Sequence, residues 1–191
     1  MRGPADIADL LAGEAGFRHA LGLVESLALP DAWIGAGFVR NAVWDALHGR
    51  RPDLGRLDDI DVIFFDPADF ARDRDTALEH RLRRLDAAPA WSVKNQARMH
   101  LRNGDRPYRD TLDAIAHWPE TATVVAARLV GGQVEILAPW GVDDLLDLVL
   151  RPTPAFRHKM DVYRKRLAAK DWLSRWPKLT VLPTRNGPSD P

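Results

Sequence analysis

The chain has 191 residues, no cysteine, and 27 acidic against 27 basic side chains, so its formal net charge is zero. The lack of cysteine excludes disulfide bridges and thiolate metal sites, and the zero net charge excludes the overall basicity of proteins that bind nucleic acid with their whole surface. No basic-then-apolar leader is visible and no apolar run reaches about 18 residues, so we expect a cytoplasmic protein that does not enter a membrane. The length suits one main domain over residues 1–150, a helical extension packed on it over 151–182, and a loose tail over 183–191.

The first predicted elements are a helix, a short strand and a second helix. Apolar side chains recur at helical spacing over residues 6–29, and Pro30 ends that helix. A short apolar strand around Ile34 follows, and residues 38–48 then indicate a helix with Gly49 as its C-terminal cap.

A glycine-containing turn joins this strand to the second helix, and it consists of Gly35, Ala36 and Gly37. Such a turn gathers free backbone N–H groups at the positive end of the helix dipole, an arrangement that favours phosphate. Arg40 and Asn41 would lie in the first helical turn, near an anion held there. Alternatively, Arg40 forms an ion pair with Asp45 of its own helix or with a carboxylate of the next strand.

The next predicted strand carries two carboxylates at its start. Ile60 and residues 62–65 form an apolar run, as is typical of a strand buried on both faces. Side chains alternate across a strand, so Asp59 and Asp61 point to the same side, with Cα atoms roughly 6.5 Å apart. Two such carboxylates repel each other unless a cation compensates them, and the pair therefore predicts a divalent metal site. Alternatively, Asp58 and Asp59 are ordinary polar residues of the loop before the strand.

A second Asp-x-Asp motif, Asp73-Arg74-Asp75, lies in a highly charged stretch over residues 66–86. The few apolar residues of this stretch recur at helical spacing, and side chains two positions apart diverge on a helix. We therefore predict that Asp73 and Asp75 are solvated surface residues.

Two basic residues follow a short strand predicted over residues 91–93. Lys94 and Arg98 would bind a triphosphate or a second substrate that accepts a transferred group. Alternatively, they would belong to a polar network inside the protein. Residues 110–117 and 143–150 indicate two further helices.

A β-hairpin is predicted in the last third of the chain. Residues 121–130 are rich in β formers, Gly131-Gly132 provides the turn, and residues 133–137 return. Glu135 lies among apolar residues of the returning strand, and Glu120 precedes the first strand.

The last predicted helix has an apolar stripe and a basic remainder. The basic side chains would bind a nucleic-acid backbone, or they would form a solvated face that balances the acidic rest of the chain. The residues that we expect to point inward are Phe156, Met160, Tyr163 and Leu167.

Three motifs follow one another in the first third of the chain: Gly-Ala-Gly-Phe-Val-Arg-Asn, Asp-Ala-Leu-His-Gly-Arg and Asp-Ile-Asp-Val. In order and spacing they resemble the head region of nucleotidyltransferases such as CCA-adding enzymes and poly(A) polymerases, which carry Gly-Gly-x-Val-Arg-Asp, a Leu-Leu-Gly-Arg-type stretch and Asp-x-Asp. Asn-Gln-Ala-Arg-Met-His, Pro-Glu-Thr-Ala-Thr and Ala-Pro-Trp-Gly-Val-Asp-Asp-Leu extend a resemblance to small bacterial nucleotidyltransferase-like proteins over nearly the whole chain. Two positions depart from the head motif, because Ala36 replaces a glycine and Asn41 replaces an aspartate. An alanine at position 36 is a mild change if its φ stays negative.

The resemblance implies an α/β (α+β) protein of the nucleotidyltransferase, or DNA polymerase beta-like, fold, with a mixed sheet flanked by helices and residues 1–150 as the catalytic domain. It implies transfer of a nucleoside monophosphate from a triphosphate such as ATP to an unknown acceptor (a small molecule, RNA or protein), with release of pyrophosphate. Asp59, Asp61 and a third carboxylate, Glu135 or its competitor Glu120, would bind Mg²⁺ or Mn²⁺. The residues that would hold the nucleotide are Gly35, Ala36, Gly37, Arg40, Asn41, Lys94 and Arg98.

An alternative function is a non-catalytic nucleotide- or RNA-binding module that keeps the same fold. The position of the third carboxylate discriminates between the two. A third acid that converges on the Asp59 and Asp61 pair favours catalysis, and its absence favours the binding module.

Overall fold

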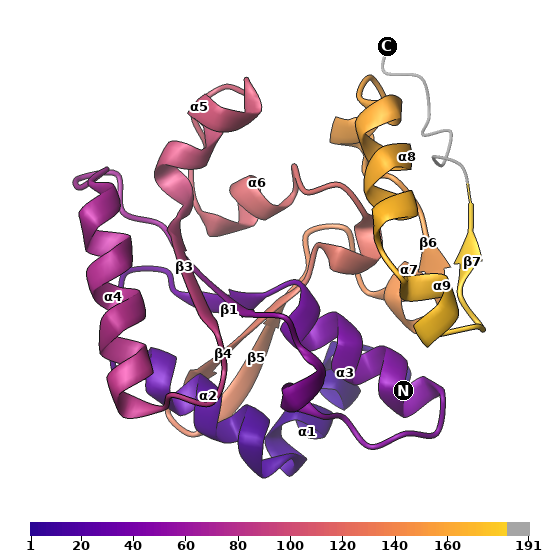
Figure 1. The fold of residues 1–191 in the computed structure, drawn as a ribbon, viewed down its shortest axis with the longest axis horizontal. Coiled ribbons are helices and arrows are strands. Elements are labelled where there is room, and N and C mark those ends of the chain that lie inside the picture. The colour runs from indigo at the N-terminus through magenta and orange to yellow at the C-terminus, as the bar shows by residue number, and fades with distance from the viewer. Residues whose placement is uncertain (183–191) are drawn as a thin grey trace.

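A five-stranded mixed sheet forms the centre of the molecule (Figure 1). The structure, a computed structural model, describes residues 1–182, so the predicted tail over 183–191 lies outside the described residues. The strand order is β3-β2-β1-β4-β5; β2 and β3 are parallel, and all other neighbours are antiparallel. The strands are β1 (Trp33–Gly35), β2 (Ile60–Phe64), β3 (Trp91–Asn95), β4 (Ala126–Val130) and β5 (Gln133–Leu137).

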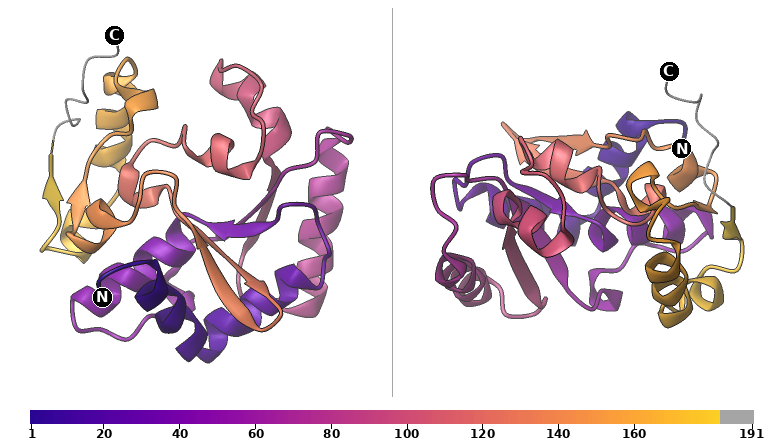
Figure 2. Two further views of the ribbon diagram at one scale, coloured as in Figure 1. Left: turned by 180° about the vertical axis from the view of Figure 1, so that it is seen from behind. Right: turned by 90° about the horizontal axis from the view of Figure 1, so that it is seen from above.

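Helices flank this sheet, as predicted. Side chains of α1 to α4 share one large buried cluster with the sheet, and Figure 2 shows α1 and the β4–β5 hairpin together at the back of the molecule. Within residues 1–182, no helix combines the length and the apolar character that crossing a bilayer requires. The helices are α1 (Pro4–Gly13), α2 (Ala15–Glu25), α3 (Gly37–Leu47), α4 (Arg72–Leu85), α5 (Met99–Asn103), α6 (Thr111–Ile115), α7 (Asp143–Leu146), α8 (Met160–Ala169) and α9 (Trp172–Arg175).

The alternation of side chains along β2 separates two apolar clusters, one on each face of the sheet. Ile60, Val62 and Phe64 are buried in the large cluster with α1 to α4. Ile63 lies on the opposite face, in a smaller cluster with Trp33 and residues of α6 and β4. Because Asp61 alternates with the first set, it lies on the face of the smaller cluster.

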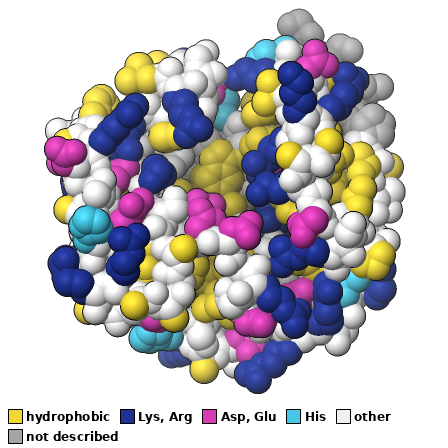
Figure 3. All heavy atoms as spheres, in the orientation of Figure 1, with side chains coloured by type: hydrophobic (Ala, Val, Ile, Leu, Met, Phe, Trp, Pro, Cys, Tyr) yellow, Lys and Arg dark blue, Asp and Glu magenta, His cyan; other side chains and the backbone are white. Residues whose placement is uncertain are grey.

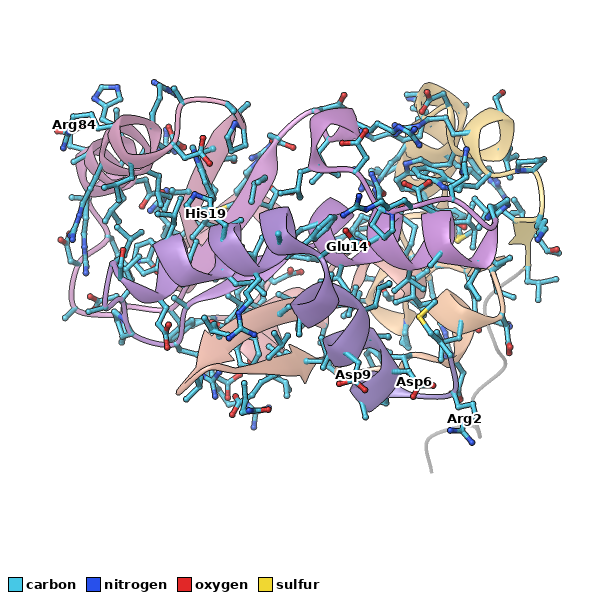
Figure 4. All side chains as sticks on the ribbon, turned by 90° about the horizontal axis from the view of Figure 1, so that it is seen from below. Arg2, Asp6, Asp9, Glu14, His19 and Arg84 are labelled. Atoms are coloured by element: carbon cyan, nitrogen blue, oxygen red, sulfur yellow. The ribbon has the colours of Figure 1, made fainter. Side chains whose placement is uncertain are left out.

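The helix predicted over residues 6–29 is two helices, because the backbone of Glu14 is extended between α1 and α2. Its carboxylate forms an ion pair with Arg51 at 3.0 Å, and Figure 4 shows Glu14 at the junction of the two helices. The apolar periodicity continues across the break, which is why the sequence predicts one helix.

The predicted hairpin is confirmed, with Ala126 opposite Leu137 and a turn at Gly131 and Gly132, both with positive φ. Its first strand is shorter than expected, because a 3₁₀ turn (Thr121–Thr123) precedes β4. The helix predicted over residues 143–150 is also shorter. It ends at Leu146, and the chain continues as β6 (Val149–Leu150), which pairs in parallel with β7 (Thr180–Val181).

The C-terminal helices attach to α3 through aromatic side chains. The ring centroids of Trp172 and Trp176 lie 5.8 and 5.1 Å from that of Trp44, and all three rings are buried in the large cluster. On α8, Tyr163 is buried as predicted, whereas Met160 and Leu167 are only half-buried. The indole ring of a tryptophan can cover a wide area, so a short α9 suffices to hold this part of the chain.

Helix α9 also fixes the loop that leads from α3 into β2. Arg50 Nη2 donates to the carbonyl oxygen of Arg175 at 3.0 Å, and Arg175 Nη2 donates to the carbonyl oxygen of Arg56 at 3.1 Å. Asp45 accepts from Trp176 Nε1 at 2.8 Å and pairs with Arg50 at 3.0 Å. Helix α9 and Trp176 therefore hold the loop that leads to the Asp59 and Asp61 pair.

Ala36 has φ 52° and ψ −117°, a conformation that suits glycine. The expectation of a mild change with negative φ is therefore wrong. Replacing Ala36 with glycine is expected to raise the free energy of unfolding by about 1 kcal/mol, because it relieves this strain. Urea denaturation measures the effect. The matched control is Ala46→Gly in the same helix, which should lower stability by about 0.5–1 kcal/mol because glycine is unfavourable inside a helix. Equal destabilisation by both changes would contradict the strained turn.

Candidate active site

Asp59 and Asp61 lie at the start of β2. Asp61 is opposite Ser92 of β3, whose side chain forms a hydrogen bond with it, and Asp59 is exposed in the loop just before the strand. In the part of the chain that the structure describes, neither carboxylate has a lysine or arginine as an ion-pair partner. The alternative agrees with the structure for the positions of Asp58 and Asp59, which are both exposed in the loop before β2, whereas Asp61 is a partly buried strand residue.

The charge of Asp61 is costly where it lies. Burial, and then the charge of Asp59, raise the pKa of Asp61 from 3.8 to about 6, while Arg40 and Lys94 act in the opposite direction. A bound cation close to the carboxylate oxygens of Asp59 and Asp61 would offset this cost.

The turn before α3 lies directly beside this pair. The antiparallel register of β1 and β2 pairs Ile34 with Val62, and its continuation places Gly35 opposite Asp61. Gly35 is required by the close approach of Trp118, because a Cβ at this position would lie 2.7 Å from the indole ring. A Cβ at Gly37 would make only ordinary contacts, so Gly37 is not required by packing. The predicted role of this turn in binding phosphate stays a prediction.

Arg40 is buried between two tryptophan rings. Its guanidinium carbon lies 4.4 Å from the ring centroid of Trp172 and 5.1 Å from that of Trp44. Its Nε and Nη2 donate to Asn41 Oδ1, at 3.1 and 2.9 Å, and its Nη1 donates to Thr123 Oγ1 at 3.0 Å. Burial lowers the pKa of Arg40 to about 10. Most of its hydrogen-bonding capacity is thus used inside the protein, and the alternative of an ion pair with Asp45 is wrong.

The structure explains why Asn41 can stand where the head motif of the similar enzymes has an aspartate. A single amide oxygen accepts both N–H groups of Arg40 without adding a negative charge to this buried place. The positive charge of Arg40 therefore still acts on Asp61 and on Glu120, which both raise its pKa.

Lys94 and Arg98 are bound by acids of α4. Lys94 Nζ lies 3.0 Å from Glu79, and Arg98 forms an ion pair with Asp75. This favours the polar network that was the alternative for the two residues. It also corrects the prediction for Asp75, which is buried at 3% exposure because Arg98 compensates its charge, whereas Asp73 is exposed as predicted.

The expected convergence of Glu135 on the Asp59 and Asp61 pair is wrong. Two strands, β1 and β4, separate β5 from β2 in the sheet. Glu135 is opposite Arg128 in the hairpin and forms an ion pair with it at 2.7 Å on the exposed surface. The sequence predicted the hairpin but not the order in which its strands join the sheet.

Glu120, the competing third carboxylate, is fully buried and also has its own partner. Arg166 of α8 donates to Glu120 Oε1 at 2.7 Å, while Oε2 has no hydrogen-bond partner. Among residues 1–182, no group of three or more histidine, cysteine or acidic side chains is arranged to hold a metal ion. The protein therefore offers two carboxylates at the site.

Three residues of the site were not predicted from the sequence. Ser92 could have been found from an assumed pairing of the two predicted strands, because it then lies beside Asp61. Thr123 and Trp118 carry no local signal, since tertiary packing alone brings them to Arg40 and to Gly35.

One face of the molecule is hollowed. Figure 3 shows acidic side chains at the lower edge of a hollow in the middle of this face, with hydrophobic side chains at its bottom and basic side chains around it. A pocket of about 420 Å³ lies between α5, the segment after α6, and α8. Its walls include Trp118, whose ring also covers Gly35 beside Asp61.

Comparisons with known proteins gave one matching family and several similar solved structures. The sequence pattern of the family described as Nucleotidyltransferase matches residues 22–181. Among solved structures, one described as a CCA-adding enzyme head domain is 33% identical, with a TM-score of 0.86 over 96% of this chain and 98% of that chain. A search of curated proteins gave no match.

Larger enzymes share the fold at lower identity. The Thermotoga maritima CCA-adding enzyme complexed with tRNA is 14% identical, with a TM-score of 0.54, and a CCA-adding enzyme complexed with CTP is 15% identical, with a TM-score of 0.56. Each match covers 95% of this chain but only 42% and 43%, respectively, of the larger enzyme. The predicted α/β fold with a mixed sheet and flanking helices is confirmed.

Proposed function

Since the chain belongs to the nucleotidyltransferase family, we propose that it transfers a nucleoside monophosphate from a nucleoside triphosphate to an acceptor, with release of pyrophosphate, at the Asp59 and Asp61 pair. One observation carries this proposal. Two neighbouring carboxylates stand at a strand end without a cationic partner among residues 1–182, and the pKa of Asp61 is raised to about 6. A carboxylate kept unpaired in a partly buried place is a frequent mark of a functional site.

The residues present fit a magnesium ion that arrives with the nucleotide. Mg²⁺ is usually bound by one or two carboxylates, and phosphate oxygens and water complete its coordination. Asp59 and Asp61 supply two carboxylates, and the described residues add no third acid. When bound, such ions would activate the attacking hydroxyl and stabilise the charge of the leaving pyrophosphate.

The protein's own contribution is to bind and orient the triphosphate. Helix α3 begins at Gly37 without a side-chain cap, so its first N–H groups are available to phosphate oxygens. Arg40 adds a positive charge that acts on Asp61, and the rings of Trp44 and Trp172 hold its guanidinium group in place. Orientation of this kind supplies much of the catalysis in phosphoryl transfer, because the nucleotide and metal carry most of the chemistry.

Transfer of an α-labelled nucleotide tests the proposal. The four nucleoside triphosphates are incubated with the protein and a panel of acceptors that includes small hydroxyl compounds, tRNA and the protein itself. We expect label on one acceptor, with equal release of pyrophosphate, in Mg²⁺ or Mn²⁺ and none after chelation by EDTA. Absence of pyrophosphate release with every nucleotide and acceptor would contradict the proposal.

A second candidate, a nucleotide- or RNA-binding module, is favoured by one specific observation. Both candidate third carboxylates are neutralised elsewhere, Glu135 by Arg128 and Glu120 by Arg166. One similar structure holds tRNA and others hold CTP or ATP, which is consistent with either candidate. Magnesium-dependent binding of a triphosphate without pyrophosphate release would establish this second function.

A further inference from the structure

The pocket of about 420 Å³ between α5 and α8 is lined by aromatic and polar side chains. We call it the Trp118 pocket; its lining includes Gln96, Met99, His117, Trp118, Phe156 and Val162. We propose that it binds the base of the nucleoside triphosphate and that it prefers adenine, an inference that rests on the proposed transfer at Asp59 and Asp61.

The position of Trp118 connects this pocket with the carboxylates. Its ring lies over Gly35, which is opposite Asp61 in the sheet, and packs against the small cluster that contains Ile63. The side chain is only half-buried, so part of it remains open to the pocket. A triphosphate held at Asp61 would thus place its base beside an indole ring. Stacking of a base on an aromatic ring is favourable for every base and strongest for large ring systems.

The polar groups of the pocket select among the bases. Gln96 is 4% exposed, and its Nε2 donates to the carbonyl oxygen of Lys94 at 3.3 Å. Its carbonyl oxygen has no hydrogen-bond donor among the described residues, although this side chain lines the pocket. A glutamine amide offers one acceptor and one donor, the pattern that complements the amino group and the ring nitrogen of adenine and of cytosine. Of these two bases, adenine has the larger ring system and therefore stacks better on the indole.

His117 adds a second acceptor. Its Nδ1 lies 2.8 Å from the carbonyl oxygen of Asp113, and a carbonyl can only accept, so Nδ1 carries the proton. In the neutral ring, Nε2 is then an acceptor, which suits the exocyclic amino group of adenine.

Guanine would need the opposite pattern. Its donors are best matched by a carboxylate, and Asp105 is the carboxylate that lines the pocket. Asp105 already accepts from Tyr108 and lies 3.4 Å from Lys159 Nζ. Its oxygens are thus occupied by partners within the protein, which leaves the N–H donors of guanine unmatched, whereas Arg102, which also lines the pocket, would match O6 and N7 of guanine. The comparison of ATP with GTP below therefore decides between the two purines.

Binding measurements with ATP, GTP, CTP, UTP and inorganic tripolyphosphate test the proposal in the presence of Mg²⁺. The wild-type protein should bind ATP the most tightly. Trp118→Ala should weaken ATP binding by about 5- to 150-fold, the range for loss of one stacking contact, and leave tripolyphosphate binding unchanged. Trp118→Phe should retain most of the affinity for ATP.

A second variant avoids the risk that Trp118→Ala fails to fold. Val162 lies on α8, is 56% exposed and lines the pocket, so Val162→Trp should fill the pocket and weaken ATP binding without disturbing the core. The matched control is Val130→Trp, at a valine of β4 that is 45% exposed and lies outside the pocket.

The results separate this proposal from the proposed function. Equal affinity for all four nucleotides, or an equal loss of ATP and tripolyphosphate binding in a folded Trp118 or Val162 variant, would overturn the base pocket. A preference for ATP that depends on Trp118 supports the base pocket, even if the wild-type protein releases no pyrophosphate. The lack of pyrophosphate release would contradict only the proposed transfer reaction.

Discussion

Replacing Asp59 and Asp61 together with asparagine is expected to abolish nucleotidyl transfer and, at the same time, to stabilise the metal-free protein. The loss of transfer should be at least about 1,000-fold, because a metal-assisted reaction loses several kcal/mol of transition-state stabilisation with its ligands. Opposite effects on activity and stability distinguish a functional carboxylate pair from a structural one, whose loss would weaken both.

The gain in stability follows from the pKa of Asp61. Burial and Asp59 raise this pKa from 3.8 to about 6, so between these values the folded protein binds more protons than the unfolded chain. The free energy of unfolding therefore falls as the pH rises through this range, and at pH 8 the ionised Asp61 costs roughly 3 kcal/mol. The asparagine variant lacks this cost.

Urea denaturation in EDTA from pH 4 to pH 8 measures the effect. The variant and the wild type should be similar near pH 4 and should differ most above pH 6. Asp73→Asn is the matched control, since Asp73 is exposed in the other Asp-x-Asp motif and should change neither activity nor stability. If the double variant is less stable than the wild type at pH 8, the carboxylates have cationic partners and the metal assignment fails.

Replacing Arg166 with methionine is expected to lower the free energy of unfolding by about 3–5 kcal/mol, the usual result of leaving a buried charge without its partner. Glu120 is fully buried, and Arg166 donates to one of its oxygens at 2.7 Å. The other oxygen has no hydrogen-bond partner. Loss of Arg166 therefore leaves the buried negative charge of Glu120 without a hydrogen-bonded cation. Thermal and urea denaturation measure the change.

Arg164→Met is the control on the same helix. Arg164 is exposed and pairs with exposed Asp161 at 3.2 Å, so its loss should change stability by less than about 0.5 kcal/mol. The double variant Glu120→Gln with Arg166→Met should recover most of the lost stability, because an amide carries no charge to compensate. Equal effects of the Arg166 and Arg164 variants would show that Glu120 is not held by this pair.

Local patterns were enough to predict several parts of this site. The apolar run around Val62 correctly predicts a buried strand that begins at Ile60 and contains Asp61, with Asp59 in the loop just before it. The turn at Gly131 and Gly132 was also predictable, since both glycines have the positive φ that a tight hairpin needs. These features depend on neighbours within a few residues.

The parts that were wrong depend on contacts between distant segments. Glu135 was misplaced because no local pattern states that β1 and β4 lie between β2 and β5. The enclosure of Arg40 was not predictable either, because Trp172, 132 positions later in the chain, covers its guanidinium group; its role in nucleotide binding stays a prediction. Asp75 was expected in solvent, and only the docking of β3 against α4 brings Arg98 to it.

The attachment of α9 to the loop before β2 has a consequence for the way the chain is made. Arg50 and Arg175 are 125 positions apart, and Arg175 and Arg56 are 119 positions apart. A ribosome synthesises the chain from its N-terminus, so the loop that leads to Asp59 is complete long before the residue that fixes it exists. A nascent chain that ends before Arg175 has every proposed metal ligand but neither of these two hydrogen bonds. The proposed site can therefore reach its final geometry only after Arg175 has been synthesised, and a chain that stops earlier lacks these two constraints on the loop before Asp59.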